Sequence, residues 1–281
     1  MRNLTLLVIV VCLFGCVNSD IRRTPPISQK GQVSLLTLNV AGLPDFLTSQ
    51  DHPKERMYGM QHYANAYDIV SFQEDFYYSR HLDRQARFKH IERGSKCNGW
   101  SLVWPWLRKS GLTLQTSLPQ TGTRFKAFST CDGHFKHGND CWVSKGVLCS
   151  RVIRNDGIIM HVCTTHMDAG QRKEGVEARA VQIQEYLAHL PEPETDRPWI
   201  LIELGDYNMR PHEEAMKLLM MGKDVVVYDF EGPNQVDYIM ITTNDLLDVD
   251  VDITRMGGAS QFDGWSDHNA VEVVLDLRLR R

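Results

Sequence analysis

Residues 199–208 read WILIELGDYN, an apolar run that ends in Asp206 and Asn208. About sixty residues further along, residues 266–275 read SDHNAVEVVL, so Asp267 and His268 stand directly before a second apolar run. Short apolar runs bounded by polar residues are typical of buried strands. We therefore expect a functional site where the polar ends of these two strands meet.

Other predicted strands also carry a polar residue at one end. These are Asn39 in strand 33–40, Glu74 in strand 68–74, His166 in strand 158–166 and Asp237 in strand 236–242. Each residue alone has an ordinary structural explanation, such as a turn, a helix cap or a solvent-exposed side chain. Their joint occurrence on successive strands indicates one shared site.

Together these residue types suit phosphodiester hydrolysis. That reaction needs a hard cation to neutralise the phosphate, a base for water, and donors for the non-bridging oxygens. Mg²⁺ takes oxygen ligands and only one or two carboxylates, and Glu74 is the first candidate ligand, with Mn²⁺ and Ca²⁺ as alternative ions. His268 is a candidate base that Asp237 would orient, while His166 and Asn208 are candidate neutral donors.

The predicted elements favour sheets packed on each other. We expect helices over 55–67, 175–190 and 211–221, and strands over 33–40, 68–74, 111–118, 145–153, 158–166, 199–204, 236–242 and 269–277. Strands outnumber helices and several are joined as hairpins, which argues against a doubly wound parallel sheet. The expected loops 45–58, 121–140 and 254–265 carry no motif that identifies a leaving group.

The N-terminal residues have the pattern of a secretory signal peptide. Arg2 precedes an apolar run over residues 4–17, and Ser19 offers a cleavage site. The run is too short to span a membrane as a stable helix. The alternative is a bacterial lipidation box at residues 13–16, in which Phe14 fits poorly. We predict a signal peptide over residues 1–19 and one secreted catalytic domain over residues 20–281.

The chain is mildly acidic. Its formal charge is −4, and removal of residues 1–19 would leave 30 basic and 35 acidic side chains, a charge of −5. Non-specific binding to nucleic acid depends on neutralising phosphates with Lys and Arg. The composition therefore disfavours a polyanionic substrate, although a local basic groove or a bridging metal would suffice for one.

Cysteine spacing predicts disulfides in a secreted chain. Cys131 and Cys141 flank a polar, glycine-rich loop that a disulfide would close. Cys149 and Cys163 flank a predicted hairpin and are either a second disulfide or two buried cysteines in adjacent strands. Cys97 is left over, and no pair has the short spacing of a zinc site.

Six motifs resemble those of the endonuclease/exonuclease/phosphatase superfamily, which has the deoxyribonuclease I-like fold. They are TLNVAGLP (37–44), FQE (72–74), THMDAG (165–170), GDYN (205–208), DYI (237–239) and SDH (266–268). The resemblance covers about residues 33–276. It implies a four-layered α/β sandwich, with two mixed sheets face to face, helices outside and the site at one rim.

The resemblance also implies a role for each matching residue. Asn39, Glu74 and Asp267 would belong to the metal centre. Asp206 and Asn208 would orient water and phosphate. His166 and His268 would be the two catalytic histidines, with Asp237 as the partner carboxylate. Which histidine acts as base and which as acid stays open.

One stretch resembles the neutral sphingomyelinase branch of the superfamily. Residues 140–148 read DCWVSKGVL and precede the first catalytic histidine. The resemblance implies a secreted, Mg²⁺-dependent phospholipase C that releases phosphocholine at a membrane surface, and we expect a monomer. Lys145 would approach the phosphate as a point charge, or else it is a solvated lysine before a strand.

Two competing functions remain. A secreted endonuclease would use the same machinery on nucleic acid, and the acidic net charge weighs against it. A binding module that keeps the fold without catalysis is the other, and the filled set of polar positions weighs against that.

The sequence also departs from the family pattern. Tyr207 replaces the more usual Phe, which is a mild change. Residues 255–265, where secreted bacterial sphingomyelinases carry a membrane-inserting hairpin, hold only Phe262 and Trp265 as aromatic residues. The tryptophan-rich stretch 100–106 is either an interfacial patch or, as we prefer, strand and core.

Overall fold

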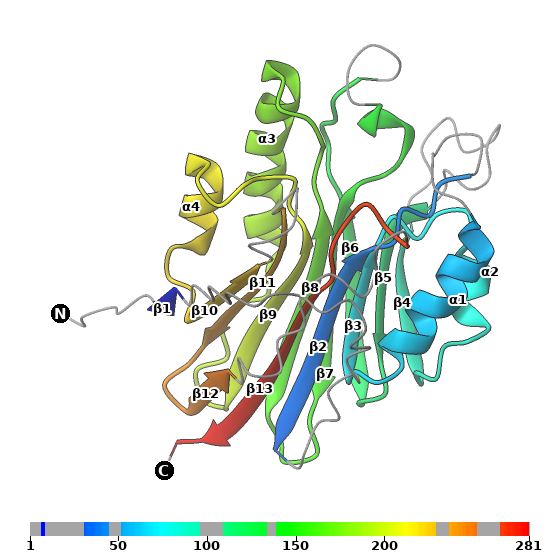
Figure 1. Ribbon diagram of the computed structural model, residues 1–281. Helices are drawn as coiled ribbons and strands as arrows, with labels where there is room; N and C mark the ends of the chain where they lie inside the picture. Colours follow the sequence, from blue (N-terminus) through cyan, green and yellow to red (C-terminus); the bar gives the residue numbers. More distant parts are fainter. Residues whose placement is uncertain are drawn as a thin grey trace, which may run out of the picture.

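The computed structural model describes residues 7–8, 31–44, 52–95, 109–133, 139–228, 236–251 and 265–280. Within these residues two β-sheets pack face to face, and helices cover their outer faces (Figure 1). This is the four-layered α/β sandwich that the motifs implied, so the expected fold class is confirmed. Stretch 100–106 and Cys97 lie outside the described residues.

The first sheet has the strand order β1-β10-β11-β9-β8-β7-β6. Its strands are β1 (Leu7–Val8), β6 (Gln120–Ala127), β7 (Gly146–Ile153), β8 (Ile159–His166), β9 (Trp199–Asp206), β10 (Val225–Tyr228) and β11 (Asp237–Thr243). β8 and β9 run parallel, whereas β11 is antiparallel to β9 and β7 to β8. The two-residue β1 falls within the predicted signal peptide, whose other residues are outside the described ones.

The second sheet has the order β12-β13-β2-β3-β5-β4. Its strands are β2 (Gln32–Asn39), β3 (Ile69–Gln73), β4 (His90–Ser95), β5 (Lys109–Thr116), β12 (Leu247–Val251) and β13 (Val271–Leu279). β2 is parallel to β3 and antiparallel to β13. The chain therefore places its first long strand and its last strand side by side.

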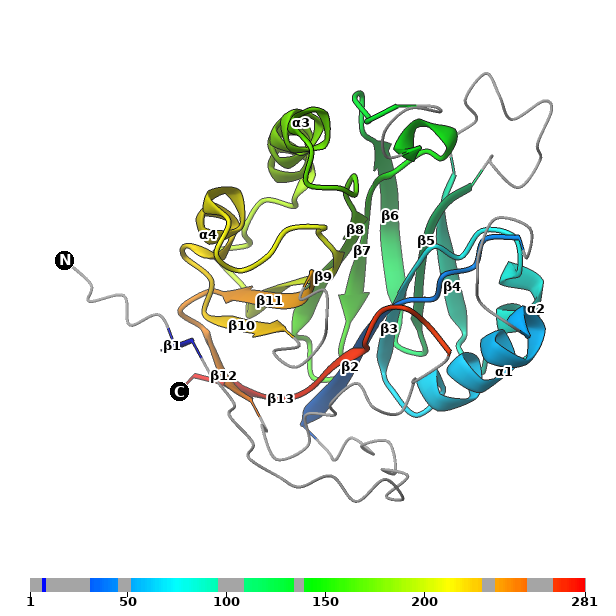
Figure 2. The same ribbon diagram turned by 45° about the horizontal axis from the view of Figure 1, so that its top comes forward.

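Three hydrophobic clusters separate the four layers. The helices are α1 (Pro53–Ala64), α2 (Ser79–Asp83), α3 (Lys173–His189) and α4 (Glu214–Met220), and a 3₁₀ turn covers Asp140–Trp142. Ile202 and Val273 belong to the cluster between the sheets. Ile183 of α3 and Met216 of α4 pack on the first sheet, and Met57 of α1 packs on the second. Figure 2 shows these helix pairs on opposite sides of the sheets.

The prediction differs from the observed structure mainly in strands at or near the edges of the sheets. Residues 121–140 were expected as a loop, but residues 121–127 belong to β6. This expectation is wrong because β6 is an edge strand with mostly exposed side chains, so it lacks the apolar pattern of a buried strand. Strands β4, β10 and β12 and helix α2 were not predicted either. No helix among the described residues is long and apolar enough to cross a membrane.

Both candidate disulfides are present. Cys131 bonds to Cys141. Cys149 of β7 and Cys163 of β8 are directly paired in the ladder and are also bonded. The alternative of two unlinked cysteines in these strands is therefore wrong.

Replacing Cys149 and Cys163 together by alanine is expected to lower the free energy of unfolding by about 2–4 kcal/mol. The two cysteines are 14 residues apart in sequence, so loss of their bond lets the unfolded chain sample more conformations. Urea denaturation of the variant and of the reduced and oxidised wild type measures the effect. Equal midpoints for all three would contradict the prediction.

Candidate active site

Neighbouring strands of the first sheet present acids and a histidine at one rim. In the ladder, Asp206 at the end of β9 pairs with Asp237 of β11 on one side and with His166 of β8 on the other. In the second sheet, Asn39 ends β2 opposite the last residue of β3, and Glu74 follows that residue directly. Each side chain therefore owes its place to strand register.

Asp206 joins the two sheets. Its Oδ2 accepts a hydrogen bond from Asn39 Nδ2 at 3.1 Å and lies 3.4 Å from His166 Nε2. His166 Nε2 in turn lies 3.9 Å from Glu74 Oε1. Polar groups of both sheets thus meet around one buried carboxylate.

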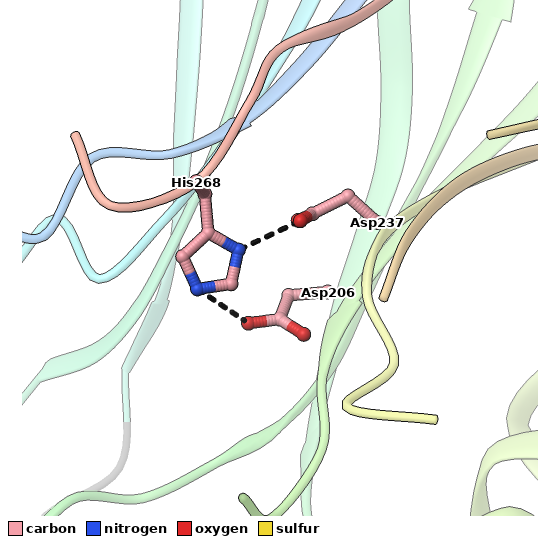
Figure 3. Close-up of side chains that lie close together, drawn as sticks. All are labelled: Asp206, Asp237 and His268. Carbon is pink, nitrogen blue, oxygen red and sulfur yellow. Dashed lines mark hydrogen bonds and ion pairs between the residues drawn. The ribbon is translucent and has the colours of Figure 1, made fainter. Parts of the chain in front are cut away.

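His268 stands between two of these acids (Figure 3). Its Nδ1 lies 2.7 Å from Asp237 Oδ2, and its Nε2 lies 3.8 Å from Asp206 Oδ2. Ser266 fixes the turn before it, because the hydroxyl donates to the Asn39 carbonyl at 2.6 Å and accepts the His268 N–H at 3.1 Å. Asp237 can therefore orient the imidazole so that Nε2 faces the site.

Backbone strain is concentrated at this rim. Glu74, Asn208 and Ala41 have φ values of 57°, 52° and 45°, in the left-handed region that residues other than glycine rarely adopt. Asn208 is held there by its N–H, which donates to Asp206 Oδ1 at 2.9 Å, and by Nδ2, which donates to the Met167 carbonyl at 2.8 Å. Strained residues of this kind are common at functional sites.

The two histidines have opposite electrostatic environments. Burial lowers the pKa of His166, and the positive charges of Lys145 and His268 lower it further. Burial also opposes the charged form of His268, but the negative charges of Asp237 and Asp206 outweigh it and raise the pKa of His268 well above its ordinary value. His166 is therefore neutral at neutral pH, and His268 holds the proton more strongly.

Two carboxyl groups of the site are hard to ionise. Burial, with the charge of Asp237 added, raises the pKa of Asp206 to about 6. Burial also raises the pKa of Glu74, although Lys145, His268 and a hydrogen bond with Asn39 oppose that rise. At both groups burial outweighs the neighbouring positive charges.

This donor set fits a hard divalent cation. Glu74 and the Asn39 Oδ1 atom offer oxygen ligands from the second sheet. Asp206, Asp237 and His268 offer three further ligand atoms within 4.8 Å of one another. His268 Nδ1 and Asp237 Oδ2 already bond to each other.

Two predicted residues lie at the margin of this cluster. Asp267 is exposed, and its charge contributes to the raised pKa of His268. Lys145 is buried, so the alternative of a solvated lysine is wrong. Its Nζ lies 2.6 Å from Asp140 Oδ1 and donates to the Met167 carbonyl at 2.8 Å.

A pocket of about 210 Å³ opens beside the cluster. It is lined by Gly170, Gln171, Asn208, Arg210, Val236 and His268. Arg210 and Gln171 were not predicted from the sequence. Their signal is only their closeness to the GDYN and THMDAG motifs, since neither residue type is distinctive in a loop.

Solved structures share this architecture. Beta toxin from Staphylococcus aureus, in a variant with bound magnesium ions, matches with a TM-score of 0.63 and 17% identity over 86% of this chain and 99% of its own. Sphingomyelinase C from Streptomyces griseocarneus matches with a TM-score of 0.62 and 16% identity over 87% and 98%. D. rerio TDP2 with a single-strand DNA product matches with a TM-score of 0.61 and 17% identity over 87% and 98%.

No protein-family model matches the sequence, and neither does any curated protein. The likeness is therefore one of fold, and it extends over nearly the whole length of each of these neighbours. With two packed mixed sheets and outer helices, this chain has the deoxyribonuclease I-like fold of these neighbours.

Proposed function

We propose that this protein is a secreted, Mg²⁺-dependent phosphodiesterase, a sphingomyelinase-like phospholipase C that releases phosphocholine from a lipid headgroup. The observation that carries the proposal is the Asp237–His268 pair, 2.7 Å apart, beside the buried Asp206. A histidine oriented by one carboxylate and facing another is a suitable acid–base unit for hydrolysis. A module that only binds a ligand would need no such pair for moving a proton.

In this proposal His268 moves the proton. Asp237 Oδ2 accepts a hydrogen bond from Nδ1–H, which leaves Nε2 to take a proton from the water that attacks phosphorus. The bond between phosphorus and the lipid alcohol then breaks, and the alcohol oxygen takes a proton from solvent water. Asp206 Oδ2, 3.8 Å from that nitrogen, holds the water in place. A cation held by Glu74, Asn39 and Asp267 would neutralise the phosphate oxygens and, as a nearby positive charge, would lower the pKa of His268 towards that of a base.

The neutral donors bind the phosphoryl group. Because His166 is uncharged, it can donate a hydrogen bond from one ring nitrogen without competing with His268 for a proton. Asn208 uses one amide hydrogen on the Met167 carbonyl and keeps the other for a phosphoryl oxygen. Donors fixed in this way stabilise the charge that develops in the transition state.

The choice of a lipid substrate has separate support. The DCWVSKGVL stretch and the sphingomyelinase C neighbour favour a choline lipid, and the acidic net charge weighs against nucleic acid. A secreted endonuclease is the second candidate, and the neighbour that holds a DNA product supports it. The two candidates need the same residues at the rim and differ in the surrounding loops.

A substrate panel tests the proposal. Purified protein is incubated with sphingomyelin vesicles, phosphatidylcholine vesicles, supercoiled plasmid DNA and a small aryl phosphodiester, each with Mg²⁺ or with chelator. We expect phosphocholine release that chelator stops and added Mg²⁺ restores. Nicking of the plasmid without phosphocholine release would reject the phospholipase C and support the endonuclease. No hydrolysis of any diester would refute both functions.

A further inference from the structure

Arg56 is a buried cation that the mechanism above does not use. It lies on α1, outside the second sheet, with 3% of its surface exposed. Its Nη1 donates to the Trp265 carbonyl, and its Nη2 donates to the Ala41 carbonyl at 3.3 Å. One guanidinium thus joins two segments that are 224 residues apart in the chain, as 265 minus 41 gives.

Both of these segments lead directly to the site. Ala41 lies two residues after Asn39, and its N–H donates to Asn39 Oδ1 at 3.0 Å. Trp265 lies three residues before His268 and immediately before Ser266, which binds both the Asn39 carbonyl and the His268 N–H. Arg56 therefore binds Ala41 and Trp265, which lie in the same two segments as Asn39 and His268.

The same helix also fixes the ring of Trp265. Gly59 stands one helical turn after Arg56, and a Cβ at this position would lie 2.2 Å from Cη2 of the indole. Trp265 packs with the cluster between α1 and the second sheet. Helix α1 therefore contacts Trp265 at two points: Arg56 binds the carbonyl of Trp265, and Gly59 lies against its ring.

We infer that Arg56 is a positioning residue that sets the distance between Asn39 and His268 across the active site. The consequence concerns Asp206, because its Oδ2 is 3.1 Å from Asn39 Nδ2 and 3.8 Å from His268 Nε2. A shift of either segment changes one of these distances. The catalytic part of the inference rests on the proposed function, while the structural part does not.

A second arginine, which also pairs with Asp156, provides a control. Arg154 donates from Nη1 to the Gly31 carbonyl at 2.6 Å and from Nη2 to the Leu277 carbonyl at 2.9 Å. Gly31 precedes β2 and Leu277 lies near the end of β13, so Arg154 joins the same two strands at the end remote from Asn39. Both arginines bridge two carbonyls, but only Arg56 does so next to the site.

Arg56→Lys and Arg154→Lys are the paired variants. Lysine keeps the charge but replaces two nitrogens in a fixed fork with one, so it cannot reproduce both bonds. We expect Arg56→Lys to lower kcat about 10- to 100-fold with KM within about twofold, because small displacements of catalytic groups cost rates of this size. Arg154→Lys should keep the wild-type kcat.

A readout independent of turnover completes the test. The proton on His268 Nδ1, which bonds to Asp237, should give a low-field NMR signal that is assigned by its absence in His268→Ala. Arg56→Lys should shift or broaden that signal, and Arg154→Lys should not. If Arg56→Lys does not fold, Gly59→Ala takes its place, because the added methyl group displaces Trp265 and leaves the guanidinium intact.

The outcomes separate the two proposals. An unchanged signal and kcat in Arg56→Lys, or equal losses in both arginine variants, would overturn the role of Arg56. If the wild type hydrolyses no diester, the proposed function fails, and the NMR comparison alone still decides whether Arg56 positions His268.

Discussion

Replacing His268 by alanine is expected to lower kcat for phosphodiester hydrolysis by about 10²–10⁴-fold, the usual contribution of a general acid or base. The reason is geometric: His268 Nδ1 is 2.7 Å from Asp237 Oδ2, so its other ring nitrogen is oriented towards Asp206 and the reacting water. Initial rates with Mg²⁺ at saturating substrate measure the loss. Asp237→Asn should cause a loss of similar size, because the Asn amide can donate to Nδ1 and so hold the imidazole in the tautomer that carries its proton on Nε2.

His161 offers the control for this prediction. It also contacts a carboxylate, with Nε2 3.2 Å from Glu194 Oε1, but it lies on β8 five residues before His166 and outside the site. His161→Ala should keep the wild-type rate. Circular dichroism should show that both alanine variants are folded, and a wild-type rate in folded His268→Ala would remove its assigned role.

Glu74→Gln is expected to give the second large effect, a loss of at least about 100-fold in metal-dependent turnover. Substitutions of groups that only support a metal ligand already cost about 10–100-fold in affinity or activity, so loss of a ligand should cost at least as much. Titration calorimetry with Mg²⁺ should show weaker binding to the variant. Glu194→Gln, which changes a carboxylate remote from the rim, serves as the control and should bind Mg²⁺ like the wild type.

Glu74→Gln lowers turnover, but it is not expected to lower the stability of the metal-free protein. Burial raises the pKa of Glu74, so in the absence of metal the folded state binds this proton more tightly than the unfolded state does. Stability from this group is therefore lost as the pH rises from the unfolded-state pKa through the folded one. In chelator at neutral pH, Glu74→Gln should unfold at the same or a higher urea concentration than the wild type. A clearly lower midpoint would mean that Glu74 is a structural residue rather than a ligand.

Tyr207 illustrates how far local sequence reasoning reaches. Its place in the GDYN motif predicted a position at the end of β9, and its difference from Phe was expected to be mild. The structure places its hydroxyl 2.9 Å from that of Tyr186, which donates to Glu203 Oε1 at 2.8 Å. Because Tyr186 has one proton and gives it to the carboxylate, Tyr207 must be the donor to Tyr186. This buried chain of hydrogen bonds joins residues from α3 and β9, which sequence spacing cannot reveal.

Packed sheets with outer helices, and the order of the polar strand ends, could be predicted from the chain, because apolar runs and the residues that interrupt them are local properties. The four-layered sandwich was implied only by the resemblance of the six motifs to a known superfamily. The pairing of Asp237 with His268 was also predicted from the chain, but the positions of Asp206 and Lys145 relative to the two histidines were not. In the folded protein the charges of Asp237 and Asp206 raise the pKa of His268, whereas burial, with the charges of Lys145 and His268 added, lowers the pKa of His166. The physical reason is that a charge acts through space over a few ångströms, and strand register and buried clamps such as Arg56 set those distances.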